Sequence, residues 1–152
     1  MINGLDPAPF AALFGQSDEA LAERGIKRVV STKTHGFPCR ITLEDVQPGV
    51  PLLLLNYEHL PVETPYRSRH AIFVRDGATA AASFTDSVPE QLATRLLSVR
   101  AFDADDMMTD ADVIDGTELE PLIARMFVDP AVAYLHVHFA KRGCFAARVD
   151  RR

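Results

Sequence analysis

Residues 133–149 read AYLHVHFAKRGCFAARV. Apolar and polar side chains alternate over residues 133–140, and a second apolar stretch follows a short polar loop. An alternation with a period of two is typical of a β-strand that buries one face. The sequence therefore predicts a C-terminal β-hairpin. The polar face of its first strand carries Tyr134, His136 and His138.

The register of this hairpin depends on the length of its loop. A two-residue loop would place the apolar face of one strand opposite the polar face of the other. A three-residue loop, residues 141–143, instead pairs Phe139 with Phe145 and continues the apolar face through both strands. A one-residue slip would turn every side chain to the wrong side, so we expect the second register. Gly143 suits the left-handed conformation that the last residue of such a loop adopts.

The expected register gathers polar groups on one face of the hairpin. The predicted cross-strand pairs there are Tyr134–Asp150, His136–Arg148 and His138–Ala146. We expect Cys144 to lie at the loop end of the same face. Two imidazoles, a phenol, a guanidinium, a carboxylate and a thiol would then share one surface.

Short elements are predicted for the rest of the chain. Helices are expected over residues 18–24, 89–96 and 117–127, the first capped by Ser17 and the other two opened by capping boxes. Strands are expected over residues 26–32, 39–43, 51–57, 70–75, 78–84, 98–103 and around 113–114. Residues 58–69 should form the longest irregular segment. Strands that follow one another directly indicate an α+β fold with two to three short helices and a mainly antiparallel sheet, able to curl toward a barrel.

Composition sets limits on the class of protein. The chain has 152 residues, 47% of them apolar, and a formal net charge of −5, so we expect one domain over residues 1–152,. The negative charge argues against a surface built to hold nucleic acid. The longest apolar run is too short to span a membrane, and we expect a cytoplasmic protein whose two cysteines are thiols. The sequence does not fix the oligomeric state, and a homodimer is compatible with it.

An anionic ligand is the first chemistry that these residues suggest. Arginine binds carboxylates and phosphates through two parallel hydrogen bonds. The expected ligand-binding residues are Arg40, Arg67, Arg148, Tyr134 and Tyr66. The alternative is that these arginines pair with acidic side chains of the protein itself.

Histidine and cysteine suggest two further chemistries. His136 and His138 share a strand face, as metal ligands must, but a third ligand would have to come from Cys144, Cys39 or His59, and no tight spacing selects one. We therefore assign no metal ligands and no cofactor. An imidazole could instead activate a cysteine as a nucleophile, although buried cysteines are usually small apolar residues. The candidate catalytic residues are His136, His138, His59 and Cys144, and whether the protein is an enzyme stays open.

Several blocks of the sequence resemble a known family. They are Gly36–Arg40, Leu43–Asp45, Pro48–Gly49, Tyr57–His59, Pro65–Arg67, Ile72–Arg75, Ala133–His138 and Gly143–Arg151. In this order they resemble the bacterial proteins grouped as domain of unknown function family 1203. The resemblance implies a stand-alone bacterial domain and no named activity. It implies motif positions at Cys39, Arg40, Tyr57, His59, Tyr66, Arg67, His136, His138, Cys144 and Arg148.

The motif positions fall into two groups far apart in the sequence, residues 39–67 and 134–148. We expect the groups to converge, with segment 58–69 lying over the polar face of the hairpin. On this basis the sequence favours a domain that binds, and can transform, a small anionic ligand. The alternatives are a non-catalytic protein-interaction module and a His/Cys metal site.

Overall fold

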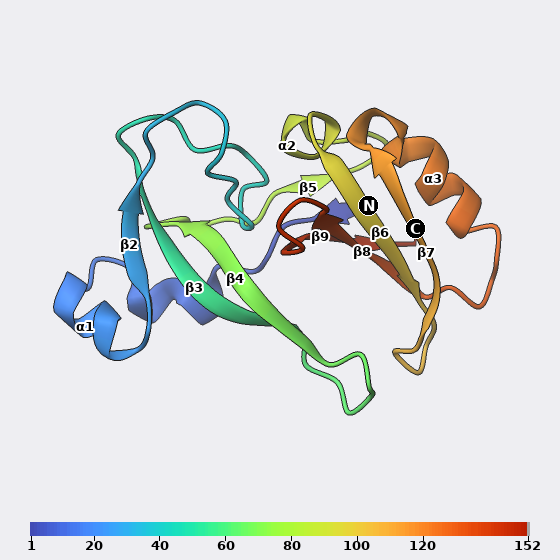
Figure 1. Ribbon diagram of the computed structural model, residues 1–152, viewed down its shortest axis with the longest axis horizontal. Coiled ribbons are helices and arrows are strands. Elements are labelled where there is room, and N and C mark those ends of the chain that lie inside the picture. Colours follow the sequence, from blue (N-terminus) through green and yellow to red (C-terminus); the bar gives the residue numbers. More distant parts are fainter. Residues whose placement is uncertain (152) are drawn as a thin grey trace.

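The computed structural model describes residues 1–151 and contains two antiparallel sheets that lie beside each other (Figure 1). The larger sheet has the strand order β5-β1-β9-β8-β6-β7: Ser83–Phe84, Ile2–Asn3, Phe145–Asp150, Tyr134–Phe139, Leu96–Phe102 and Met108–Asp115. The smaller sheet has the order β2-β3-β4: Lys27–Val30, Pro51–Leu60 and Ser68–Arg75. The predicted α+β fold is confirmed, and neither sheet closes into a barrel.

Short helices cover these sheets. They are η1 (Ala8–Leu13), α1 (Asp18–Glu23), α2 (Glu90–Ala93), η2 (Gly116–Glu118) and α3 (Leu119–Met126). The Ser17 hydroxyl caps α1 by accepting a hydrogen bond from the Ala20 backbone N–H, as predicted. Among residues 1–151, no helix is long and apolar enough to cross a membrane.

Each sheet has its own apolar core. In the larger sheet, Val99 of β6 and Val137 of β8 pack with Leu122 and Met126 of α3. The smaller sheet packs Leu52 and Ile72 against N-terminal residues and against residues 39–46. Because α3 covers one face of β8, the histidines of that strand point to the opposite face.

The hairpin of β8 and β9 has the predicted register over most of its length. Tyr134, Leu135, His136 and Val137 pair with Asp150, Val149, Arg148 and Ala147. The loop ends at Gly143, which has a φ of 76° as expected for the left-handed position. The apolar alternation was therefore sufficient to fix this part of the register.

A β-bulge at Ala146 makes the rest of the predicted register wrong. His138 faces Phe145 instead of Ala146, and the Phe139 N–H bonds to the Cys144 carbonyl at 3.0 Å. One extra residue in a strand reverses which face the following side chains point to. Phe145 accordingly joins the histidines, and Cys144 joins the apolar core cluster with Phe139 instead of the histidine face.

The predicted strand over residues 39–43 is also wrong. This segment is a tight turn in which the Leu43 N–H bonds to the Cys39 carbonyl at 3.1 Å and Leu43 has a φ of 52°. The alternation of apolar residues does not reflect a half-exposed strand, because Arg40 is as deeply buried as its neighbours. Its guanidinium finds hydrogen-bond partners inside the protein, which an alternating pattern cannot reveal.

Three other element boundaries differ from expectation. Strand β3 continues through His59 to Leu60, so only residues 61–67 are irregular, and residues 78–84 contribute only the two-residue β5. Helix α2 is one turn long because Leu96 and Leu97 pair in the larger sheet. Neither predicted capping box forms, since no side chain caps α2 or α3.

Candidate functional site

Three histidines from the two sheets meet at one point. His59 lies near the end of β3, and His136 and His138 lie on β8. The ring centroid of His59 is 6.0 Å from that of His136 and 5.1 Å from that of His138. One ring nitrogen from each of the three lies within 4.8 Å of the others. We call these three residues the histidine triad.

Aromatic side chains enclose the triad. The Phe145 ring stacks on His59, with centroids 5.3 Å apart and an interplanar angle of 13°, and meets His136 edge-on at 5.0 Å. Phe102 contacts His136 from β6 at 5.2 Å. Because the bulge turns Phe145 toward the imidazoles, His136 and His138 are only 2% and 1% exposed. The face expected to be half exposed is therefore buried.

The loop of the hairpin fixes the protonation pattern of His138. Its Nδ1 lies 3.0 Å from the carbonyl oxygen of Gly143, and because a carbonyl only accepts, Nδ1–H donates this bond,. The lone pair of His138 is then on Nε2, which is buried and has no hydrogen-bond partner. A backbone acceptor that orients one ring nitrogen and frees the other is the usual arrangement around a metal-binding histidine.

Each member of the triad has a buried nitrogen without a partner. These atoms are Nδ1 of His59, Nδ1 of His136 and Nε2 of His138. An unsatisfied buried polar atom costs about 1–3 kcal/mol, and proteins contain few of them. Three such atoms in one cluster point to a ligand that would satisfy all three.

The electrostatics keep these imidazoles neutral. Burial lowers the pKa of His136 to about 2, helped by the neighbouring charges of His138 and His59. Burial, with the Arg100 charge next in importance, lowers the pKa of His138 to about 3 and that of His59 to about 4. Near pH 7 all three rings therefore offer lone pairs and carry no charge.

Arg100 is a site residue that the sequence interpretation missed. It lies on β6 directly opposite His136, so both side chains are on the same face of the larger sheet,. Its Nε–H is 3.4 Å from the Ser98 hydroxyl oxygen, and no ion pair joins it to a carboxylate among residues 1–151. The sequence feature that could have identified Arg100 is its position two residues after Ser98, in a strand of otherwise mainly apolar residues.

Arg40 lies near this region but uses its donors internally. It is 1% exposed, donates to the Phe145 carbonyl at 2.8 Å, and also bonds to the Pro38 carbonyl. A further N–H lies 3.0 Å from the Cys144 sulfur. Burial lowers the Arg40 pKa to about 10, against the opposing effect of Cys144. The buried Arg40 side chain thus holds the first residue of β9 in place through the Phe145 carbonyl.

The other expected arginines have acidic partners. Arg67 donates to Glu58 and Glu63 at 2.7 Å each and is half exposed. Arg148 donates to Asp150 at 2.7 Å and stacks over the Tyr134 ring with its guanidinium carbon 3.9 Å from the centroid.

The two expected tyrosines lie beside the triad. Tyr134 donates its hydroxyl to Asp106 at 2.7 Å and contacts the His136 ring at 5.2 Å. Tyr66 meets Phe102 edge-on at 6.2 Å, which brings segment 61–67 against the larger sheet. The structure therefore places His59, Tyr66, Tyr134, His136 and His138 in one neighbourhood.

The remaining cysteine lies in the other core. Cys39 is fully buried, and its sulfur accepts backbone N–H groups, including that of Arg75 at 3.2 Å. Neither Cys39 nor Cys144 has a ligand atom in the triad.

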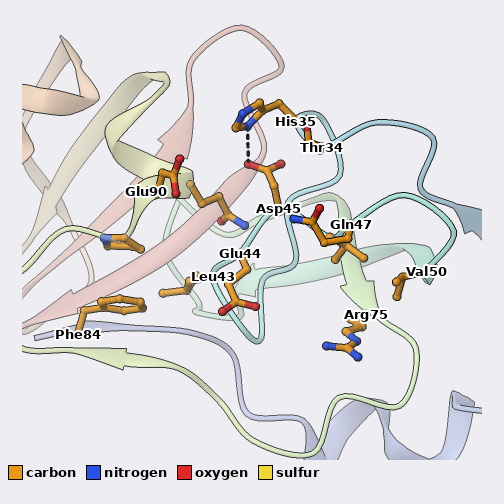
Figure 2. A pocket seen from close by; sticks show the side chains of 13 residues that line it. Thr34, His35, Leu43, Glu44, Asp45, Gln47, Val50, Arg75, Phe84 and Glu90 are labelled. Carbon is orange, nitrogen blue, oxygen red and sulfur yellow. Dashed lines mark ion pairs between the residues drawn. The ribbon is translucent and has the colours of Figure 1, made fainter.

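A cavity of about 720 Å³ lies away from the triad (Figure 2). Its lining includes His35, Glu44, Asp45 and Glu90, and none of the residues expected from the sequence to form a site. Figure 2 shows His35 beside Asp45, with 3.8 Å between the imidazole and the carboxylate. Arg95 also holds Asp45 at 2.7 Å, so the Asp45 carboxylate already has a partner within the protein.

Comparison with protein families identifies the lineage. A model described as "Protein of unknown function (DUF1203)" matches residues 36–151, which includes the whole histidine triad and Arg100. The chain belongs to the DUF1203 family. Comparisons with curated proteins and with solved structures find no match. The triad of this DUF1203 protein must therefore be interpreted from its own geometry.

Proposed function

We propose that this DUF1203 protein binds a divalent transition-metal ion through His59, His136 and His138, and that the ion holds a small anionic ligand. The observation that carries the proposal is that the three imidazoles bring one ring nitrogen each to within 4.8 Å of the others, and that each ring also has a buried nitrogen without a hydrogen-bond partner. Histidine is the commonest metal ligand in proteins, and a single ion would satisfy all three nitrogens at once.

The spacing of the triad is compatible with one ion. Histidine nitrogens bind zinc at about 2.1 Å, which places the nitrogens of a tetrahedral site roughly 3.4 Å apart. The triad nitrogens lie within 4.8 Å of one another. Closing around an ion needs side-chain movements on the order of 1 Å, and His136 and His138 already share one face of β8,.

The ligand set favours particular metals. Imidazole suits zinc, copper, iron and nickel, whereas calcium and magnesium prefer oxygen ligands, which the triad lacks. Three protein ligands also leave a coordination position open, as in catalytic zinc sites. All three ligands are neutral, so the charge of the ion remains to be balanced by an anion from solution.

The same data disfavour two alternatives. A general base works best with a pKa near the working pH, whereas the pKa values of the triad lie at about 2 to 4,. A protein-interaction module would present its motif residues on the surface, but His136 and His138 are buried. The triad is better suited to holding a metal than to carrying protons or contacting a partner.

Metal binding to chelator-treated protein tests the proposal. Titration with Zn²⁺ in a calorimeter should show one equivalent bound, and Co²⁺ should give the absorption bands of a nitrogen-ligated site. The variants His59→Ala, His136→Ala and His138→Ala should each weaken binding by at least about 100-fold, since each removes a ligand.

His35→Ala is the matched control, because the His35 side chain is 65% exposed and lies outside the triad. It should bind metal as the unmodified protein does, and circular dichroism should show all variants folded. Wild-type protein that binds no metal, or triad variants that bind it normally, would rule the proposal out.

A further inference from the structure

We infer that Arg100 and the triad-bound metal ion form a two-point site for a small oxyanion of the carboxylate or phosphate type, with one oxygen on the ion and another on the guanidinium. This inference rests on the proposed metal site. It adds a residue that has no assigned role and names the class of ligand.

Arg100 has the position that such a site requires. It lies opposite His136 on the neighbouring strand, and directly opposed residues of an antiparallel pair have their Cβ atoms about 5 Å apart,. Its Nε–H lies 3.4 Å from the hydroxyl oxygen of Ser98, and Ser98 pairs with His138 across the same two strands. Arg100 and the two histidines of β8 therefore share one face of the larger sheet,.

Arg100 also has no carboxylate counter-ion among residues 1–151. Its side chain is partly buried, and burial lowers its pKa. By contrast, Arg148 and Arg67 are paired with carboxylates. Burying a charge is costly unless it is paired, so a half-buried guanidinium without an acid favours binding of an external anion.

The nearby acids are already engaged. Asp106 accepts the Tyr134 hydroxyl, Asp150 pairs with Arg148, and Glu58 pairs with Arg67. A divalent ion on three neutral imidazoles beside Arg100 would therefore create a strongly positive site with no carboxylate ligand in it. Such a site concentrates anions.

The shape of guanidinium selects oxyanions among the anions. Its planar fork of N–H donors can donate to one oxygen of a carboxylate or phosphate while a second oxygen binds the ion, whereas a halide is a single atom and cannot bridge the ion and the fork. A ligand that offers one oxygen to the ion keeps another for the fork. The enclosing rings of Phe145 and Phe102 favour small ligands at this position.

Anion titrations of the Co²⁺-loaded protein test this inference. The visible spectrum is followed while acetate or inorganic phosphate is added, with chloride at matched ionic strength as the reference. We expect a saturable change with at least one oxyanion and little change with chloride. The oxyanion that binds more tightly identifies which of the two classes the site prefers.

Two substitutions at Arg100 separate its charge from its shape. Arg100→Met should keep Co²⁺ binding and weaken oxyanion binding by at least about tenfold, because it removes a charge-assisted hydrogen bond to the ligand. Arg100→Lys keeps the charge without the fork and should lie in between. Arg69→Met is the control, since Arg69 on β4 bonds to Asn56 and is exposed.

The outcomes test the role of Arg100 separately from the proposed metal site. If the wild-type protein binds no Co²⁺, both are overturned. If Co²⁺ binds but oxyanions bind equally well to wild-type, Arg100→Met and Arg69→Met proteins, the metal site stands and the role of Arg100 is overturned. If Arg100→Met does not fold, Arg100→Lys takes its place in the comparison. Thermal unfolding checks that Arg100→Lys is folded.

Discussion

At the scale of single residues, Gly143 has two roles that can be separated. Its φ of 76° favours glycine, and its carbonyl orients the His138 ring. Many substitutions there would disturb both roles at once. The space around its missing Cβ is open, so alanine can be tested without a clash.

Gly143→Ala should destabilise the protein by about 1 kcal/mol, because an L-residue in the left-handed region is strained. Urea unfolding of the metal-free protein measures this cost. Gly77→Ala is the matched control, since Gly77 has a φ of 81° and equally open surroundings. Because alanine retains the backbone carbonyl, we expect the two variants to lose similar stability and Gly143→Ala to keep the Zn²⁺ affinity of the unmodified protein; a clearly larger loss of stability for Gly143→Ala would contradict the strain argument.

Arg40 is the second residue whose substitution separates structure from function. Arg40→Met would leave the Phe145 and Pro38 carbonyls without their present donor. We expect a loss of about 3 kcal/mol, typical of breaking a buried charged hydrogen-bond group. Denaturant unfolding measures it. Cys144→Ala should cost less, because it removes one weak acceptor; a larger loss for Cys144→Ala would contradict this ranking.

At the scale of elements, strand β8 is unusual because it buries imidazoles on one face and apolar residues on the other. A buried neutral histidine resists protonation in the folded state but not in the unfolded state. Its folded pKa is below the unfolded value near 6.5, so its contribution to stability is complete above pH 6.5 and is lost as pH falls.

Metal-free protein should therefore become less stable on acidification below pH 6.5. His136 and His138, with pKa values of about 2 and 3, would each contribute a slope of about 1.4 kcal/mol per pH unit between pH 6 and pH 4,. Urea unfolding at several pH values measures the slope. A His136→Gln variant should show a shallower slope, and an unchanged one would contradict the burial argument.

The elements also show what the sequence could predict. Strand β3 was predictable from its long apolar run, and strand β8 from its regular alternation of apolar and polar residues, because each pattern is typical of a strand. The bulge was not, since Ala146 fits either face of a strand and its insertion is decided by where Phe145 packs. The turn over residues 39–43 was missed because Arg40 takes an acceptor 105 residues away in sequence.

For the candidate site, the sequence placed His136 and His138 on one face and offered His59 as one of three further ligands. It could not select His59 over the cysteines, because that choice depends on how β3 meets the larger sheet. Arg100 was missed because its role follows from pairing with His136, which its position in a mainly apolar strand does not reveal.

At the scale of the whole molecule, the triad joins the two sheets. His59 comes from β3 of the smaller sheet and the other two histidines from β8 of the larger one (Figure 1). An ion bound there would crosslink two separate apolar cores. Metal occupancy should then affect the stability of the complete protein.

Zinc should raise the midpoint of thermal unfolding. At 100 times its dissociation constant, a ligand that binds only the folded state adds about 2.7 kcal/mol, which corresponds to a shift of several degrees for a chain of this size. Calorimetry with and without Zn²⁺ measures the shift, and excess chelator should reverse it. His59→Ala protein should show no shift in the unfolding midpoint, because it lacks the ligand that the smaller sheet contributes to the ion.

The bulge at Ala146 has a consequence for how such a chain can change during evolution or engineering. Phe145 and Ala147 face opposite sides of the sheet because β9 has one extra residue, Ala146, between them; if the same chain paired without the bulge, residues 145 and 147 would face the same side,. Phe145 would turn away from the imidazoles toward the α3 side of the sheet, and the site would lose its aromatic wall. Strand length, counted in single residues, is thus as much a determinant of the site as the identity of the histidines,.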